Sequence, residues 1–266
     1  MTLKNRMLSS PLGPLMVTVY LSIRRERCRA IWKDGAWVLS YRDGIVVSPR
    51  PGVRSPSMQE RTTRDHYIWG STLHRGNTVL DVGAGIGSEI PTFSKDVGDT
   101  GRVIAIEAHP VTFGFLERNV RANRIDNVSV HQAAVTRAEG TVAIANDLDD
   151  HIGNSIVMEN NAGGVDVPAV TLDGLIDSEN IDSVALLKMN IEGAEVGALQ
   201  GASTTLSVTR QVCICCHDFK ADRTGDELLR TSRDVKELLL EAGFRLRLRP
   251  DDFRPWVRDT VYGAKQ

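Results

Sequence analysis

Residues 79–87 read Val-Leu-Asp-Val-Gly-Ala-Gly-Ile-Gly, and residues 103–107 read Val-Ile-Ala-Ile-Glu. The apolar residues of the first stretch indicate a buried strand that runs into a glycine loop and then into a helix. The second stretch indicates the next buried strand, which ends in the acidic residue Glu107. Ligands of doubly wound sheets bind outside the carboxyl ends of the strands, where the winding reverses. Because an acidic residue there can accept both hydroxyls of a ribose, the two stretches predict a pocket for a nucleoside cofactor.

The spacing of the glycines separates two classes of nucleoside cofactor. A dinucleotide-binding loop carries G-x-G-x-x-G and holds a pyrophosphate at the helix N-terminus, whereas Gly83, Gly85 and Gly87 give G-x-G-x-G. The carboxylate of Asp81, two residues before this loop, would repel a pyrophosphate but would suit the cationic methionine portion of S-adenosylmethionine. We therefore predict S-adenosylmethionine as the cofactor, with NAD as the alternative. Glycines that serve only the tight packing of a βαβ turn are the purely structural alternative.

Residues at the ends of neighbouring strands complete the predicted cofactor pocket. We expect Asp81 and the backbone of the glycine loop on the methionine portion, and Glu107 on the ribose. Residues 132–134 end the third strand and should line the adenine pocket, whereas His109 lies either near the ribose or in solvent. The residues predicted to bind the cofactor are Asp81, Gly83, Ala84, Gly85, Gly87, Glu107, Ala108, Gln132, Ala133, Ala134 and Asn190.

Strands and helices alternate regularly from residue 78 onward. The expected strands cover 78–82, 102–107, 128–134, 141–145, 167–170, 184–191, 211–216, 244–248 and 257–263, and the expected helices cover 88–97, 111–123, 172–176, 194–199 and 226–242. Such alternation predicts a parallel sheet with helices on both faces. The short connection between the last two strands requires them to pair antiparallel. The predicted fold class is α/β, a Rossmann-like class I methyltransferase fold with a mostly parallel sheet and an antiparallel last strand.

Residues 1–75 are predicted to form an extension, and residues 76–266 the cofactor-binding domain. The extension should contain a helix over 12–23, a hairpin of strands 36–41 and 45–48 around Asp43-Gly44, a proline-containing linker over 48–57 and a helix over 60–73. The first helix has an apolar face, which must pack on the main domain, a second subunit or a membrane surface. That face consists of Leu12, Leu15, Met16, Val19, Tyr20 and Ile23.

The charge of the chain is divided unevenly between the two regions. Residues 1–75 hold 13 Lys/Arg and 5 Asp/Glu, whereas residues 76–266 hold 19 Lys/Arg and 29 Asp/Glu. The basic extension can therefore pack on the acidic domain, or it can dock a second subunit and build a homodimer. We do not expect nucleic acid as a partner, because no aromatic-plus-basic motif accompanies the positive charge.

Cysteine usage and the distribution of apolar residues bear on the compartment. No run of about 18 apolar residues occurs, so we expect no membrane span, and the N-terminus lacks the small-residue cleavage site of a signal peptide. Three of the four cysteines lie in one apolar run, where alternation would place Cys213 and Cys215 on the same face. We interpret them as small apolar residues of a buried strand rather than as a metal or redox cluster. A cytoplasmic protein is the resulting expectation.

Five stretches of the chain resemble the FkbM family of S-adenosylmethionine-dependent O-methyltransferases. They are residues 81–87, Ile106-Glu107-Ala-His-Pro110, Val167-Pro-Ala-Val-Thr-Leu-Asp173, Leu187-Lys-Met-Asn-Ile-Glu-Gly-Ala-Glu195 and Cys216-His-Asp-Phe219, of which the fourth is the most specific. The similarity runs from about Val79 to the C-terminus. Known members methylate hydroxyls on sugars, glycolipids and polyketide-derived rings, so the resemblance implies that class of acceptor. The family usually has Asp where this chain has Asn190, which puts in doubt any role there that needs a negative charge.

Methyl transfer to an alcohol is an in-line displacement that needs a base as the new bond forms, and such a base contributes about 10²–10⁴-fold. His217 and Asp218 end the strand over 211–216, at the carboxyl edge of the sheet. We predict His217 as the general base because its ordinary pKa suits this role, with Asp218 orienting it or contacting substrate. The alternative is that His217 only bonds neighbouring backbone. Glu192 is the second candidate base, and Asn190 should point to the same side as Glu192.

Two further expectations concern the acceptor and a metal. Asn154 and Ser155 lie in the loop after the added strand over 141–145, and we expect this loop either to contact the acceptor or to be a surface loop. Asn190, Glu192 and Asp218 carry oxygen atoms that suit Mg²⁺. We predict no metal, because Asn stands in place of Asp, and keep Mg²⁺ as the alternative.

The predicted function is methylation of a hydroxyl on a small-molecule acceptor, namely a sugar, a glycolipid or a polyketide-type secondary metabolite. The glycine loop, Glu107 and the edge at His217 and Asp218 motivate this prediction. An NAD-dependent oxidoreductase is the first alternative. A non-catalytic module that binds S-adenosylmethionine is the second, because Asn190 departs from the family pattern.

Overall fold

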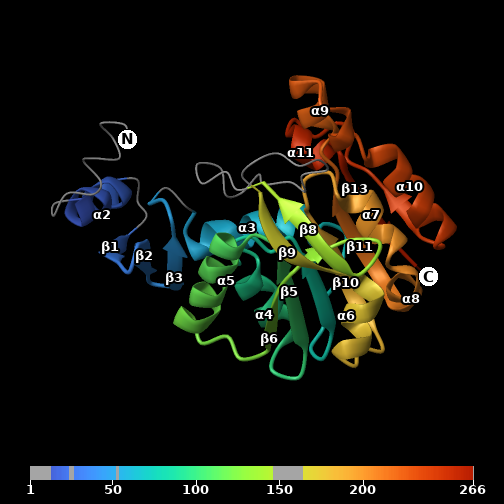
Figure 1. Ribbon diagram of the computed structural model, residues 1–266. Helices are drawn as coiled ribbons and strands as arrows, with labels where there is room; N and C mark the ends of the chain where they lie inside the picture. Colours follow the sequence, from blue (N-terminus) through green and yellow to red (C-terminus); the bar gives the residue numbers. More distant parts are fainter. Residues whose placement is uncertain (1–12, 24–26, 52–53, 146–163, 266) are drawn as a thin grey trace.

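The computed structural model describes residues 13–23, 27–51, 54–145 and 164–265, and a seven-stranded sheet forms its centre (Figure 1). The strands lie in the order β12-β13-β11-β10-β4-β5-β6. Neighbouring strands are parallel, except that β13 is antiparallel to both β11 and β12. This confirms the predicted fold class. The bounds of the strands are β4 (Thr78–Val82), β5 (Arg102–Glu107), β6 (Val128–Gln132), β10 (Val184–Met189), β11 (Thr209–Cys215), β12 (Arg245–Arg247) and β13 (Thr260–Ala264).

Helices cover both faces of the central sheet, because alternate residues of each buried strand point to opposite sides. Leu80 and Ile104 pack in one apolar core with α6, α7, α8 and α10. Val79 and Val103 pack in a second core with α4 and α5, and Cys213 and Cys215 share that second core, as the alternation predicted. The helices are α3 (Pro56–His66), α4 (Ile90–Val97), α5 (Pro110–Ala122), α6 (Leu172–Ser178), α7 (Glu195–Gln200), α8 (Ser203–Val208), α9 (Asp218–Thr224), α10 (Ser232–Glu241) and α11 (Pro255–Arg258).

The helix predicted over 226–242 is broken in the structure. Its first part is a 3₁₀ turn, η1 (Glu227–Leu229), and α10 begins only at Ser232. The side chain of Asp218 accepts hydrogen bonds from the backbone N–H groups of Thr231 and Ser232, at 3.2 and 3.0 Å. A helix end needs such partners for its first N–H groups, and here the partner lies on a different helix. The predicted start of this helix was wrong because the contact with Asp218 that determines it cannot be read from the sequence near residue 226.

A second sheet lies beside the carboxyl end of the first, and its order is β7-β9-β8. Its strands are β7 (Ala134–Val135), β8 (Gly140–Ile144) and β9 (Val165–Val170). We expected one strand over 128–134, but the chain leaves the central sheet after Gln132 and joins the second sheet at Ala134. This change of sheet turns residues 133–135 toward the space beyond β4 and β5.

The N-terminal region forms a third sheet with a helix against it (Figure 1). The predicted hairpin is present as β2 (Ala36–Tyr41) and β3 (Gly44–Ser48), and an additional strand, β1 (Cys28–Lys33), pairs with β2. The helix α2 (Gly13–Ile23) buries Val17 and Leu21 against this sheet. Among the described helices, none is long and apolar enough to cross a membrane. The boundary between an extension and a domain at residues 75 and 76 stays a prediction.

The described part of the apolar face that we predicted for α2 does not pack on the main domain, and its packing on a second subunit or a membrane surface stays a prediction. Leu15, Met16, Val19 and Tyr20 are each more than two fifths accessible to solvent, whereas Val17 is 5% and Leu21 is 4% accessible. Apolar residues occur on nearly every side of this helix, so their spacing does not select one face. The sheet beneath the helix selects the face instead.

Asn119 of α5 and Asn123, the residue that follows this helix, attach the N-terminal sheet to the central domain. Asn119 accepts a hydrogen bond from the N–H of Val47 at 2.7 Å and donates one to the carbonyl of Val47 at 2.8 Å. Asn123 makes the same two bonds to Ile45, at 2.8 and 2.7 Å. Residues four apart share a helix face, and residues two apart share a strand side. The two amide side chains therefore act as a neighbouring strand for β3.

We expect Asn119→Ala to lower the free energy of unfolding by about 1–3 kcal/mol, because the buried N–H and carbonyl of Val47 would lose their partner. Chemical denaturation measures the loss, and hydrogen exchange at the Val47 amide should become faster. Glu117→Ala on the same helix is the control. If both variants left stability and exchange unchanged, the attachment would not depend on the amide.

Candidate active site

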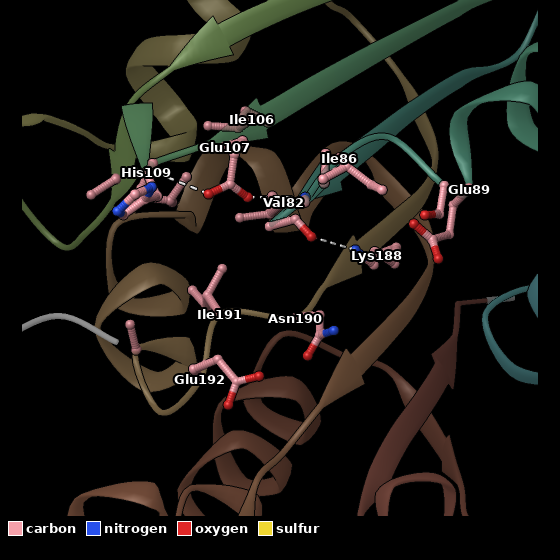
Figure 2. Close-up of a pocket in the computed structure, with 18 of the residues that line it drawn as sticks. Val82, Ile86, Glu89, Ile106, Glu107, His109, Lys188, Asn190, Ile191 and Glu192 are labelled. Atoms are coloured by element: carbon pink, nitrogen blue, oxygen red, sulfur yellow. Dashed lines mark hydrogen bonds between the residues drawn. The ribbon is translucent and has the colours of Figure 1, made fainter. Parts of the chain in front are cut away.

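A cavity of about 460 Å³ opens at the carboxyl ends of β4, β5 and β10, where the winding of the sheet reverses (Figure 2). Most of the residues predicted to bind the cofactor lie on its wall, namely Gly83, Ala84, Gly85, Glu107, Ala108, Ala133, Ala134 and Asn190, together with His109. The wall also includes residues that sequence reasoning did not select, among them Arg54, Gln59, Tyr67, Glu89, Val135, Ile144 and Lys188. The cavity therefore joins residues that are spread along the chain from Arg54 to Ala194.

The first glycine of the loop is required by a close approach of backbone. Gly83 has a φ of +72°, and a Cβ atom added there would lie 2.0 Å from the carbonyl oxygen of Asn190. The loop after β4 thus lies directly against the end of β10. Gly87 has a different role from the one predicted, because it is not on the cavity wall and its Cβ would lie 2.7 Å from Leu116 Cδ1. It is a glycine for the packing of α5 against the loop.

Glu107 is the acidic residue that ends β5, and it lies on the cavity wall at the end away from Lys188 (Figure 2). Its two carboxylate oxygens accept hydrogen bonds from the N–H groups of Gly85 and His109, each at 2.9 Å. Burial raises the pKa of Glu107 above its usual value, although these two N–H groups oppose the shift. Each carboxylate oxygen can accept more than one hydrogen bond, so Glu107 is oriented by the backbone and can still receive hydroxyl donors.

Gln132 does not line the cavity, contrary to the prediction. It ends β6 opposite Glu107 in the central sheet, and its side chain is exposed. The next residues turn into the second sheet, so Ala133, Ala134 and Val135 reach the cavity wall in its place. The prediction assumed that one strand continued through residue 134, and the change of sheet reverses which side chains face the cofactor.

Asp81 is also not where the sequence suggested. It is fully buried and lies on the same side of β4 as Val79, behind the cavity wall. Its carboxylate pairs with the ammonium of Lys188 at 2.7 Å, and Lys188 is its direct neighbour on β10. The carboxylate of Asp81 therefore contacts Lys188, which lies on the cavity wall, and does not itself reach the cavity. The charge argument that we drew from Asp81 against a pyrophosphate does not hold, because Lys188 neutralises this carboxylate.

Lys188 connects Asp81 to the glycine loop. Its Nζ donates a hydrogen bond to the carbonyl of Gly83 at 2.8 Å and lies 5.2 Å from the ring centroid of Tyr67. Burial disfavours its charge, but Asp81 and Glu89 outweigh this effect and raise the pKa of Lys188. A lysine inside the apolar run of β10 was the signal in the sequence, because a buried ammonium needs an anionic partner.

Glu89 lies at the same end of the cavity as Lys188, immediately before α4 (Figure 2). One of its oxygens accepts a hydrogen bond from Gln59 Nε2 at 2.8 Å. Burial, with a contribution from Asp81 and against the effect of Lys188, raises the pKa of Glu89 to about 7. Sequence reasoning missed this residue, although an acidic residue two positions after a glycine loop was visible.

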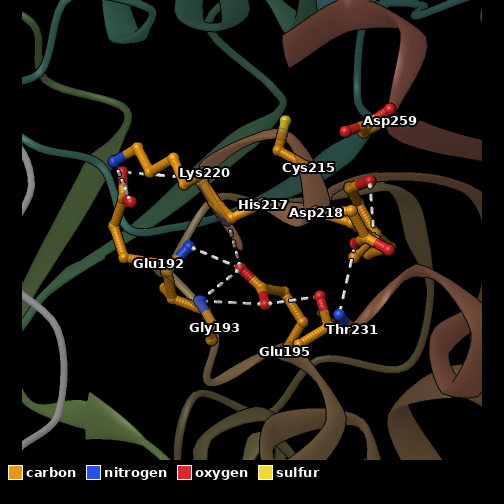
Figure 3. Close-up of polar contacts among 12 residues, drawn as sticks. Glu192, Gly193, Glu195, Cys215, His217, Asp218, Lys220, Thr231 and Asp259 are labelled. Carbon is orange, nitrogen blue, oxygen red and sulfur yellow. Dashed lines mark hydrogen bonds and ion pairs between the residues drawn. The ribbon is translucent and has the colours of Figure 1, made fainter. Parts of the chain in front are cut away.

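Asn190 and Glu192 both lie on the cavity wall, although β10 ends at Met189 and the strand alternation behind the prediction does not reach them. Glu192 has a φ of +55°, a conformation that non-glycine residues rarely adopt and that is often found at functional sites. Its carboxylate pairs with Lys220 and with His217 Nε2, the latter at 3.3 Å (Figure 3). Burial raises the pKa of Glu192, but His217 and Lys220 together lower it by more. The pKa of Glu192 is therefore below its usual value.

His217 lies behind Glu192 rather than on the cavity wall (Figure 3). It is 4% exposed, and its Nδ1 lies 3.2 Å from Glu195, which also accepts from the N–H groups of Ile191 and Gly193. Burial alone would lower the pKa of His217, but the carboxylates of Glu192 and Glu195 raise it to about 10. An imidazole that is protonated at neutral pH cannot accept a proton. The geometry therefore does not favour the predicted role of His217 as the general base.

Asp218 does not orient His217. Its carboxylate caps the first turn of α10 through the N–H groups of Thr231 and Ser232. Two glutamates perform the orienting role that we assigned to Asp218. Among the described residues, no group of three or more His, Cys, Asp or Glu side chains could hold a metal ion. Asn154 and Ser155, expected to contact the acceptor, lie outside the described residues.

The comparison with protein families decides between the classes of cofactor. A family model described as the methyltransferase FkbM domain matches residues 81–246. The chain belongs to the FkbM methyltransferase family. Membership of this family confirms S-adenosylmethionine as the predicted cofactor.

Known proteins that are similar to this member of the FkbM family match different shares of its chain. The crystal structure of methyltransferase FkbM from Methylobacillus flagellatus has a TM-score of 0.53 and 19% identity, over 79% of this chain and 50% of that one. Ribosomal protein L11 methyltransferase from Thermotoga maritima is 32% identical over 120 residues, which span 45% of each chain. Methyltransferase 1 from Beauveria bassiana is 23% identical over 203 residues, 66% of this chain and 76% of that one. The chain thus matches less than half of the L11 methyltransferase.

The residues of the cavity fit S-adenosylmethionine. The loop at Gly83 leaves no room for a side chain against β10, and a backbone without side chains can approach a ligand closely. Glu107 is positioned by two backbone N–H groups for a ribose, and Ala133, Ala134 and Ile144 supply small apolar surfaces. We propose that Gly83–Gly85, Glu107, Ala108, Ala133, Ala134 and Asn190 hold this cofactor.

Gly83→Ala tests the close approach of the loop to β10. We expect it to lower the free energy of unfolding by about 1–3 kcal/mol and to abolish measurable binding of S-adenosylhomocysteine, because the added methyl meets the Asn190 carbonyl. Calorimetry measures both quantities. Gly114→Ala is the matched control, because a Cβ at this helical position of α5 meets no atom within 4 Å. Normal binding by Gly83→Ala would contradict the assignment of the loop.

The raised pKa of His217 predicts how stability changes with pH. Its pKa is about 10 in the folded protein and 6.5 as its ordinary value, so its stabilising charge is fully present below pH 6.5. This contribution is lost as the pH rises from 6.5 through 10. Denaturation at pH 7 and 9.5 should show a larger loss for the wild type than for His217→Gln. An imidazole titration by NMR with a midpoint near 6.5 would contradict the charged pair.

Proposed function

We propose that this methyltransferase transfers the methyl group to a hydroxyl of a small-molecule acceptor, a sugar, a glycolipid or a polyketide-type ring. The observation that carries the proposal is the carboxylate of Glu192 on the cavity wall, next to the end of β10 that contacts the glycine loop. The FkbM family match supports methyl transfer, and the resemblance of the sequence motifs to that family implies this class of acceptor. When bound, S-adenosylmethionine supplies an electrophilic methyl group.

A hydroxyl acceptor requires a group that takes its proton. The proton of a hydroxyl becomes strongly acidic as the new C–O bond forms, so a carboxylate with a low pKa can accept it. Glu192 is such a carboxylate, because His217 and Lys220 keep it ionised. We therefore assign to Glu192 the role of the base, and to His217 and Lys220 the role of positioning it.

Glu195 has a different part in this arrangement. It is fully buried, and it accepts hydrogen bonds from the backbone of Gly193 and from the hydroxyl of Thr231. These bonds hold it against His217 Nδ1, so that the histidine donates with both nitrogens to two glutamates. Glu195 thereby holds His217, and His217 in turn holds the carboxylate of Glu192. Asn190, beside Glu192 on the cavity wall, is an amide that can both donate to and accept from an acceptor hydroxyl.

A screen of acceptors tests the class of substrate. Methyl glycosides, catechols and hydroxylated aromatic polyketides are incubated with S-adenosylmethionine, beside amines and ribosomal protein L11. Release of S-adenosylhomocysteine with a hydroxyl probe, and a methyl ether in the mass spectrum, is the expected result. Methylation confined to nitrogen of the amines or of the protein would refute the proposal.

Glu192→Gln tests the base. With a hydroxyl acceptor, we expect kcat to fall by about a hundredfold or more, whereas the affinity for S-adenosylhomocysteine should change little. Glu227→Gln is the control, since Glu227 is an exposed glutamate that pairs with Arg230 at the surface. Equal kcat values for Glu192→Gln and the wild type would remove Glu192 from the mechanism.

A further inference from the structure

We expected the carboxylate of Asp81 at the end of the cavity where Lys188 lies, but Asp81 is not on the cavity wall. A cationic group of a ligand would be attracted to the carboxylate of Asp81 and to the carbonyl of Gly83. Lys188 contacts both, at 2.7 and 2.8 Å. Because its ammonium already carries the positive charge at these two groups, a second cation must find a different partner.

Three carboxylates lie among the described residues of the cavity wall, and they differ in what holds them. Two backbone N–H groups bind Glu107 at the far end, and two cationic side chains bind Glu192. Glu89, in contrast, accepts from the neutral amide of Gln59 at 2.8 Å and lies beside Lys188 (Figure 2). It is 9% exposed. An ammonium that approaches Glu89 therefore does not have to displace a cation hydrogen-bonded to it.

We propose that Glu89 binds the α-amino group of S-adenosylmethionine. The amino-acid end of this cofactor carries one ammonium and one carboxylate, and this end of the cavity likewise offers one carboxylate and one ammonium, Glu89 and Lys188. Glu107 lies at the opposite end, where a ribose is expected, so the two glutamates mark the two ends of one ligand (Figure 2). The proposal rests on the cofactor alone and is independent of the acceptor.

The groups around Glu89 make its binding sensitive to pH. Lys188 on β10 and His66 on α3 favour its ionised form, whereas burial and Asp81 on β4 disfavour it, and Tyr67 also faces it. The balance raises the pKa of Glu89 to about 7. A ligand ammonium binds the ionised form, so affinity should increase as the pH rises through 7, and binding below pH 7 should release a proton.

Two ligands that differ in the amino-acid end of the cofactor measure how much this end contributes to binding. S-adenosylhomocysteine carries it, and 5′-methylthioadenosine has the same adenosine and thioether without it. Calorimetry at pH 7.5 compares both ligands on the wild type, Glu89→Gln and Asp96→Asn. Asp96 is the control because it is an acidic residue of α4, the helix that follows Glu89, and it pairs with Arg64 near the surface.

We expect Glu89→Gln to weaken S-adenosylhomocysteine by about ten- to a hundredfold, the range of a lost hydrogen bond to a charged group. The affinity for 5′-methylthioadenosine should stay within about twofold, which also shows that the variant folds. Asp96→Asn should bind both ligands as the wild type does. An equal loss for both ligands, or no loss for either, would overturn the proposal.

The dependence on pH gives a second readout. The affinity of the wild type for S-adenosylhomocysteine should rise about fivefold or more between pH 6 and 7.5, whereas Glu89→Gln should show a flat profile over this range. Calorimetry in buffers of different ionisation enthalpy should detect a released proton with the wild type only. A rise of the same size in both proteins would assign the titration to another group and overturn the proposal.

Discussion

The buried ion pair between Lys188 and Asp81 is the interaction on which the site depends. The two residues are direct partners in the register of β10 and β4, the central strands of the sheet. Neither charge can remain without the other, because loss of one partner of a buried pair costs about 3–5 kcal/mol. The same ammonium binds the Gly83 carbonyl, so the register of two strands and the position of the glycine loop are set together. The floor of the cavity follows from this one contact.

The features that could be predicted from the sequence are those determined by residues close to one another in the chain. Apolar runs identified the parallel strands, and the glycine loop and Glu107 located the cavity. In each case, the residues that determine the structure are neighbours in the chain, so the pattern contains the physical reason.

The errors have the opposite origin, because each depends on a residue far away in the chain. Lys188 withdraws Asp81 from the cavity, and two glutamates change the protonation of His217. The change of sheet after Gln132 is caused by pairing with β9, more than 30 residues later. Glu89 looks like an ordinary residue at a helix start until Gln59 and Lys188 are placed beside it. Chemistry of this kind is determined by tertiary contacts and not by spacing.

The amides of Asn119 and Asn123 have a consequence beyond attachment. They bind the outer side of β3, and the hydroxyl of Thr18 accepts from the N–H of Ala30 on β1, at the opposite edge of the same small sheet. Unpaired strand edges are templates for aggregation, and both edges of this sheet are partly covered by side chains. At these positions, growth of the sheet by an added strand would require the side chains of Asn119, Asn123 and Thr18 to move away first.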